Sequence, residues 1–181
     1  MLPIELIVQG IGEVVFPALC KLQDDRARFQ SLYLRLIRLA AFVVFPIFLG
    51  VAAISDDFVG VIWGHQWIRA GGLLAILCLT GCLQSMCFPC GWVYLAMGRS
   101  AAMARWGLLG NSILLSSIVV GISTGNIEGL AWSYFVGNLL VFAPCQYYAM
   151  RIIGLGVMSV VREALPSFLI ACVMFACVYA L

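Results

Sequence analysis

Long apolar runs dominate this 181-residue chain and limit the folds that it can adopt. Hydrophobic residues make up 64% of the sequence, charged residues only 10%, and the mean hydropathy is +1.10. Soluble domains carry about a quarter charged residues. A bilayer core about 30 Å thick needs roughly 20 apolar residues per helix, so we predict an all-α, polytopic transmembrane helical bundle of about six spans. The predicted spans are Leu2 to Cys20, Leu32 to Ile54, Gly72 to Met97, Arg105 to Thr124, Gly129 to Met150 and Ala164 to Leu181.

The ten Lys and Arg residues predict the orientation of these spans. Nine of them lie in or beside alternate loops, and only Arg69 lies in a loop on the other side. Cytoplasmic loops are enriched in Lys and Arg. We therefore expect the loops around Lys21–Ser31, Gly98–Arg105 and Arg151–Glu163 to be cytoplasmic and the amino terminus to be outside. The net charge of +2 is small and its basic residues are scattered, which argues against nucleic-acid binding.

The basic tract from Lys21 to Arg38 has a second interpretation besides anchoring. It can also attract anionic lipid headgroups, at about 1 kcal/mol per basic residue near the surface.

No linker or low-complexity stretch divides the chain, so residues 1–181 are predicted to form a single transmembrane helical bundle. In the predicted topology the chain begins outside and ends within the apolar run VMFACVYAL. We therefore expect it to be the carboxy-terminal portion of a longer protein.

The prolines Pro46, Pro89 and Pro144 lie inside predicted spans, and Pro17 lies near the end of one. Each removes one helical hydrogen bond, and in lipid the freed carbonyl needs a partner in a neighbouring helix or a water-filled cavity. Interrupted helices are frequent in transporters, but proline is also common in ordinary membrane helices.

The stretch Ser55 to Gly72 is too polar to span and predicts a short interfacial helix, either an aromatic belt or a gate.

Polar residues inside apolar spans are the candidate site residues, because they are costly there unless they face a cavity or a partner. Glu5, Gln9 and Glu13 share one helix face, which suits a cation site, a polar lining or a structural ion pair. A second helix face carries Ser31, Arg35 and Arg38. This face suits either membrane anchoring or contact with a phosphate at the cytoplasmic mouth of the bundle. The other polar positions, which could line a cavity or join helices, are Thr80, Gln84, Ser85, Asn111, Ser112, Ser116, Tyr134, Asn138 and Gln146.

The eight cysteines and the single histidine do not form a metal-binding pattern. Most of the cysteines lie in apolar spans, where cysteine behaves as a small hydrophobic residue, and no His/Cys zinc spacing is present. The sequence also lacks a Ser/His/Asp arrangement and a phosphate-binding glycine loop. We therefore predict a protein that is not an enzyme and has no cofactor.

The order of motifs between Val14 and Ser100 resembles the polysaccharide transport family of bacterial lipid-linked oligosaccharide flippases. The stretch VVFPALCKLQDDRARFQSLYLRLIRLAAFVVFPIFLGVAAISDDFVGVIWGHQW, followed by YLAMGRS, carries the resemblance. It contains a helix ending in FPAL, a loop with LQDD, a helix with FP, an outer loop of the form G-x-x-W and a helix ending in A-x-G-R. The wider superfamily also contains multidrug extruders and the lipid II flippase.

This resemblance implies a flippase of about twelve to fourteen spans in the bacterial inner membrane, of which six spans would be the later half. Its implied substrate is an undecaprenyl-diphosphate-linked oligosaccharide for lipopolysaccharide, capsule or exopolysaccharide biosynthesis. The implied partners are membrane lipids and the glycan polymerase and export machinery. The chain alone would lack the amino-terminal half of the cavity.

We select Glu13, Arg35, Arg38, Gln84 and Asn111 as candidate substrate-binding residues. Two alternatives remain at the level of sequence. One is an integral membrane enzyme of envelope glycan assembly, a polymerase or acyltransferase, and the other is a non-transporting membrane subunit.

Overall fold

The computed structural model describes residues 15–179, and every regular element among them is a helix. Residues 15–21 are helical, and a turn leads into α2 (Arg26–Ala53). The short helices α3 (Ser55–Trp63) and η1 (His65–Ala70), the latter a 3₁₀ helix, follow at the far end of α2. The remaining helices are α4 (Gly71–Ala96), α5 (Ser100–Ser123), α6 (Ile127–Ile153) and α7 (Val157–Tyr179).

Among residues 15–179, four helical segments are long and apolar enough to cross a membrane. They are α2, the continuous segment of η1 and α4, α5, and α7. The helix α6 has 27 residues, enough to span, and carries the polar side chains Asn138 and Gln146. This chain is a multi-pass membrane protein, and the all-α prediction is confirmed. The predicted first span, Leu2 to Cys20, lies mostly outside the described residues.

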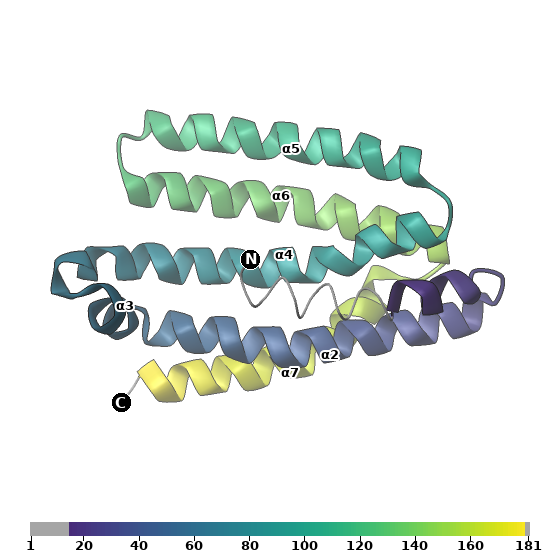
Figure 1. Cartoon of the computed structure of the whole chain (residues 1–181), viewed down its shortest axis with the longest axis horizontal. Helices are drawn as coiled ribbons and strands as arrows, with labels where there is room; N and C mark the ends of the chain where they lie inside the picture. Colours follow the sequence, from purple (N-terminus) through teal and green to yellow (C-terminus); the bar gives the residue numbers. More distant parts are fainter. Residues whose placement is uncertain (1–14, 180–181) are drawn as a thin grey trace.

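The long helices lie side by side in the order α5, α6, α4, α2 and α7 (Figure 1). The closest partners are α2 with α7, α4 with α6, α5 with α6, and α2 with α4. By contrast, α4 and α5 touch little, although they follow each other in the chain. The loop between them contains Gly98 with a φ of 65°, in the left-handed region that favours glycine.

The core runs along a stripe of α2 in which buried residues recur every fourth position. Residues four apart form the ridges by which helices pack. The stripe contains Phe29, Tyr33, Ile37, Ala41, Phe45 and Leu49, and Tyr33 reaches α4, where its hydroxyl lies 3.6 Å from the Sγ of Cys90.

The prolines lie inside helices, as predicted: Pro46 in α2, Pro89 in α4 and Pro144 in α6. In the turn before Pro89, the Nε2 of Gln146 donates a hydrogen bond of 2.8 Å to the carbonyl of Met86. A side chain of α6 thus bonds to a backbone carbonyl of α4 next to that of Ser85, which loses its usual helical donor at Pro89.

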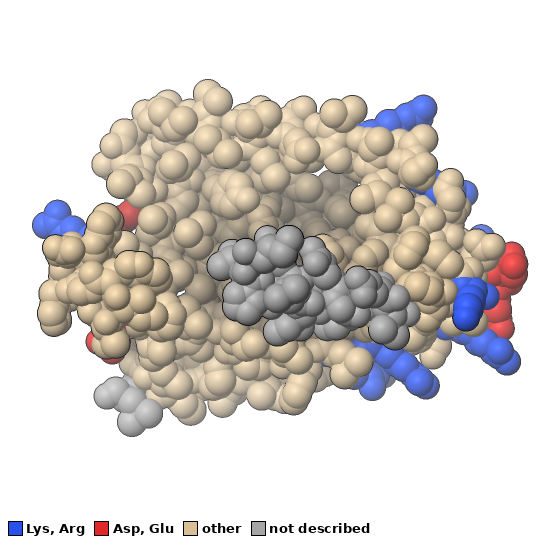
Figure 2. Space-filling model, viewed as in Figure 1, with Lys and Arg blue, Asp and Glu red and all other residues tan. Residues whose placement is uncertain are grey.

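The basic residues gather at one end of the bundle (Figure 2). The loops before α2, between α4 and α5, and between α6 and α7 meet at this end, which we call the basic end (Figure 1). Nine of the ten Lys and Arg residues lie toward it, whereas Arg69 in η1 lies at the opposite end.

Candidate functional site

A cavity of about 550 Å³ lies between α4, α5 and α6. It forms where α4 and α5 both pack on α6 but touch each other little. None of the described residues that line it carries a charge. Its side-chain amides are those of Gln84, Asn111 and Asn138, one from each of the three helices.

Gln84 and Asn138 are joined by hydrogen bonds across α4 and α6. The Nε2 of Gln84 donates to the hydroxyl of Tyr134 at 2.9 Å and to the Oδ1 of Asn138 at 3.1 Å. Asn138, which is only 8% exposed, in turn donates to the carbonyl of Tyr134 at 2.9 Å. These contacts hold the two amides in fixed orientations at the wall of the cavity.

Asn111 lies opposite this pair, on α5, and its side chain is exposed. An amide can both donate and accept hydrogen bonds. Among the described residues, the cavity therefore presents one amide without a hydrogen bond and one fixed amide pair, all within a largely apolar wall.

Aromatic side chains form the wall of the cavity toward the basic end. Trp92 and Phe88 of α4 meet edge to face, with ring centroids 5.3 Å apart. Trp106 of α5 lies against Tyr148 of α6 at 4.3 Å. Large rings with one apolar face available can contact the apolar faces of a ligand.

One glycine of the cavity wall leaves space beside it. A Cβ added at Gly107 on α5, which lines the cavity, meets no atom within 4 Å. A longer side chain at this position would therefore enter free space.

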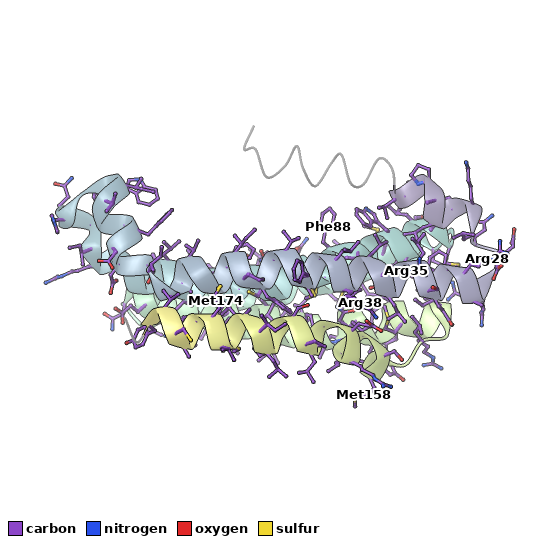
Figure 3. All side chains as sticks on the ribbon, turned by 90° about the horizontal axis from the view of Figure 1, so that it is seen from below. Arg28, Arg35, Arg38, Phe88, Met158 and Met174 are labelled. Carbon is purple, nitrogen blue, oxygen red and sulfur yellow. The ribbon has the colours of Figure 1, made fainter. Side chains whose placement is uncertain are left out.

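The structure brings together two of the five predicted site residues, Gln84 and Asn111. Arg35 and Arg38 do not line this cavity. Arg38 instead pairs with Glu163 of α7, with Nε and Nη2 at 2.6 and 2.5 Å from Oε2, and Figure 3 shows it where α2 meets α7. Glu13, like Glu5 and Gln9, lies outside the described residues.

Most of the other polar positions bond within their own helices. The hydroxyls of Thr80, Ser85, Ser112 and Ser116 each donate to the carbonyl four residues earlier. Gln146, 2% exposed, accepts from the Sγ of Cys90 at 3.1 Å and joins helices in the core. Among residues 15–179, no group of three or more His, Cys, Asp or Glu side chains could hold a metal ion.

Sequence reasoning did not select Asn138, Trp106 or Glu163. Asn138 carried the same signal as Asn111, an amide inside an apolar span. Trp106 carried none, because a lone tryptophan near a span end is typical of the membrane interface.

Comparisons with known proteins support the family predicted from the sequence. Residues 1–71 match the model of a family described as polysaccharide biosynthesis protein. The teichuronic acid biosynthesis protein TuaB of Bacillus subtilis is 26% identical over 96% of this chain and 36% of that protein. The lipopolysaccharide biosynthesis protein WzxC of Escherichia coli is 25% identical, over 72% of this chain and 26% of that protein.

A third relative, the probable low-salt glycan biosynthesis flippase Agl15 of Haloferax volcanii, is 25% identical over 63% of this chain and 23% of that protein. The chain thus spans between about a quarter and a third of the length of these relatives. No solved structure matches it.

Proposed function

We propose, from the relationship of this chain to the polysaccharide biosynthesis proteins and flippases, that it forms part of a flippase for lipid-linked oligosaccharides. The substrate class is an undecaprenyl-diphosphate-linked saccharide, and the membrane is the bacterial inner membrane. The saccharide moves from the cytoplasmic to the outer leaflet, for lipopolysaccharide, capsule or exopolysaccharide biosynthesis. The glycan polymerase and export machinery are the proposed partners.

The observation that carries this proposal is the uncharged amide cavity between α4, α5 and α6. Amides in an apolar span are costly unless they have partners or a polar ligand. Saccharide hydroxyls both donate and accept hydrogen bonds, which suits Gln84, Asn111 and Asn138. The rings of Trp92 and Trp106 provide apolar area for the faces of the sugar.

The basic end serves the diphosphate in this proposal. Arg35 and Arg38 lie on α2 toward that end (Figure 3). An arginine guanidinium suits phosphate oxygens because it offers several donors in one plane. Together with the other basic residues, Arg35 and Arg38 attract the anionic headgroup to the cytoplasmic side. Glu13 stays a predicted substrate contact.

The test measures which leaflet holds undecaprenyl-linked saccharides in cells that depend on the full-length protein. Asn111→Ala and Gln84→Ala should lower the rate of saccharide appearance outside, each by about fivefold to tenfold, as expected for the loss of one hydrogen bond. Gly107→Leu should block transport more strongly, because its side chain fills the cavity. Repeat units should accumulate on the cytoplasmic leaflet.

Matched controls separate these effects from general damage. Asn126→Ala and Gln66→Ala remove the same groups outside the cavity, and Gly72→Leu adds the same side chain where a Cβ also meets nothing within 4 Å. All three should transport normally. If the undecaprenyl-linked saccharides reach the outer leaflet normally but stay unpolymerised there, the result would point instead to an enzyme of glycan assembly. If neither the leaflet that holds them nor their polymerisation changes, the result would point to a structural subunit.

A further inference from the structure

A second hollow, separate from the amide cavity, lies between α2 and α7. This α2–α7 groove has a volume of about 740 Å³ and shares no lining residue with the cavity. Both helices begin at the basic end and run in the same direction (Figure 1). The groove therefore runs from the basic end toward the middle of the bundle.

The part of the groove toward the basic end is polar and carries net positive charge. Its charged residues are Arg38, Arg162 and Glu163. Glu163 pairs with Arg38, whereas Arg162 has no carboxylate within 4.0 Å among residues 15–179. Ser159 also lines this part, and Ser167 lines the groove five residues beyond Arg162. One excess cation with nearby hydroxyls suits an anionic phosphate.

The deeper part of the groove is apolar and faces outward. Leu39, Phe42 and Ile170 line it, and each is about three-fifths exposed. Ile170 lies eight residues beyond Arg162, which corresponds to about 12 Å along a helix. The groove thus places a cation beside an outward-facing apolar track, as a lipid with a charged head requires.

Two prolines add an independent feature at the groove. Pro46 lies four residues after Phe42, and Pro166 lies four residues after Arg162. The backbone carbonyls of Phe42 and Arg162, which both line the groove, therefore lose their usual helical donors. A freed carbonyl at membrane depth needs a donor from protein, water or ligand. A lipid headgroup with hydroxyl groups can supply that donor at Arg162.

We propose that the α2–α7 groove binds one anionic glycerophospholipid of the surrounding bilayer. Its phosphate lies at Arg38 and Arg162, a headgroup hydroxyl reaches the carbonyl of Arg162, and one acyl chain follows the apolar track. Basic pockets between transmembrane helices on the cytoplasmic side are suited to such headgroups. This site shares no lining residue with the amide cavity, although Arg38 also belongs to the basic end that is proposed to attract the diphosphate.

The test is native mass spectrometry of the purified full chain in detergent, with phosphatidylglycerol or phosphatidylcholine added at equal concentration. Phosphatidylglycerol should be retained preferentially. Arg162→Ala should weaken its retention about fivefold, as expected from about 1 kcal/mol per arginine. Glu163→Gln should strengthen it, because this change removes the negative charge and releases Arg38.

The controls are an exposed arginine outside the groove and a neighbouring lipid-facing position. Arg105→Ala should leave retention unchanged. Ile170→Trp should obstruct the apolar track, whereas Val173→Trp, with a similar exposed fraction on the same helix but outside the groove, should not.

Equal retention of both lipids, or equal losses for Arg162→Ala and Arg105→Ala, would overturn the proposal. Preferential retention of undecaprenyl phosphate over phosphatidylglycerol would also overturn it, by assigning the groove to the transported lipid. Since this measurement contains no saccharide, its failure would leave the proposed transport function to its own test.

Discussion

At the scale of single residues, Tyr94 is the least satisfied polar side chain that the structure describes. Tyr94 is 3% exposed and lines the amide cavity, yet its hydroxyl has no hydrogen-bond partner among the described residues. A buried donor without a partner lowers the stability of the folded state by about 1–3 kcal/mol.

Tyr94→Phe should therefore raise the free energy of unfolding by about 1–3 kcal/mol, because it removes the unpaired hydroxyl and keeps the ring. Thermal denaturation of the purified protein in detergent measures this change. Tyr134→Phe is the control: it removes a hydroxyl that accepts from Gln84, and it should give no gain. A loss of stability in Tyr94→Phe would contradict the prediction.

The sequence could identify single site residues but could not pair them. An amide in an apolar run is conspicuous, and this signal found Gln84 and Asn111. That both line one cavity depends on α4 and α5 packing on α6 with a gap between them, which no local pattern encodes. Likewise Arg38 and Glu163 are 125 positions apart, so Arg38 was interpreted without its partner.

At the scale of helices, small residues set the distance between α5 and α6. A Cβ added at Gly121 of α5 would come within 2.8 Å of the Cα of Leu130 in α6. Because this neighbour is backbone, it can move away only if the helices separate. Small residues permit such close approach of helices in membranes.

Gly121→Ala should therefore destabilise the protein by about 1–3 kcal/mol, the usual cost of overpacking. Gly107→Ala is the matched control on the same helix, since its Cβ meets nothing within 4 Å, and it should be neutral or slightly stabilising. Unfolding in detergent with increasing denaturant compares the two variants. Equal effects would show that the α5–α6 distance is not the cause.

Three helices extend beyond the predicted apolar spans, all in the same direction. The spans were predicted from Leu32, Arg105 and Ala164, but α2, α5 and α7 begin earlier, at Arg26, Ser100 and Val157. All three starts lie at the basic end. Charged residues end an apolar run but not a helix, because arginine and glutamate are good helix formers.

At the scale of the whole molecule, charge separates the two ends. The basic end holds nine basic residues and the acidic residues Asp24, Asp25 and Glu163. The opposite end holds Arg69 with Asp56, Asp57 and Glu128. The excess of basic residues predicts that the basic end is cytoplasmic.

The single lysine, Lys21, makes this orientation measurable because it lies exposed at the basic end. A membrane-impermeant amine reagent should label Lys21 in inverted membrane vesicles and not in right-side-out vesicles. Gln66→Lys, at the opposite end, should show the reverse pattern, with each label located by peptide mass spectrometry. Labelling of Lys21 from the outside would overturn the predicted orientation.

The pairing of α2 with α7 also affects how the chain is made. The ribosome must add 125 residues after Arg38 before Glu163 exists, which takes about 6–25 s at typical rates of synthesis. During this interval the newly inserted α2 has neither its ion-pair partner nor the helix that covers one side of it. Insertion factors or chaperones that shield a polar helix face would find α2 exposed until the last described helix leaves the ribosome.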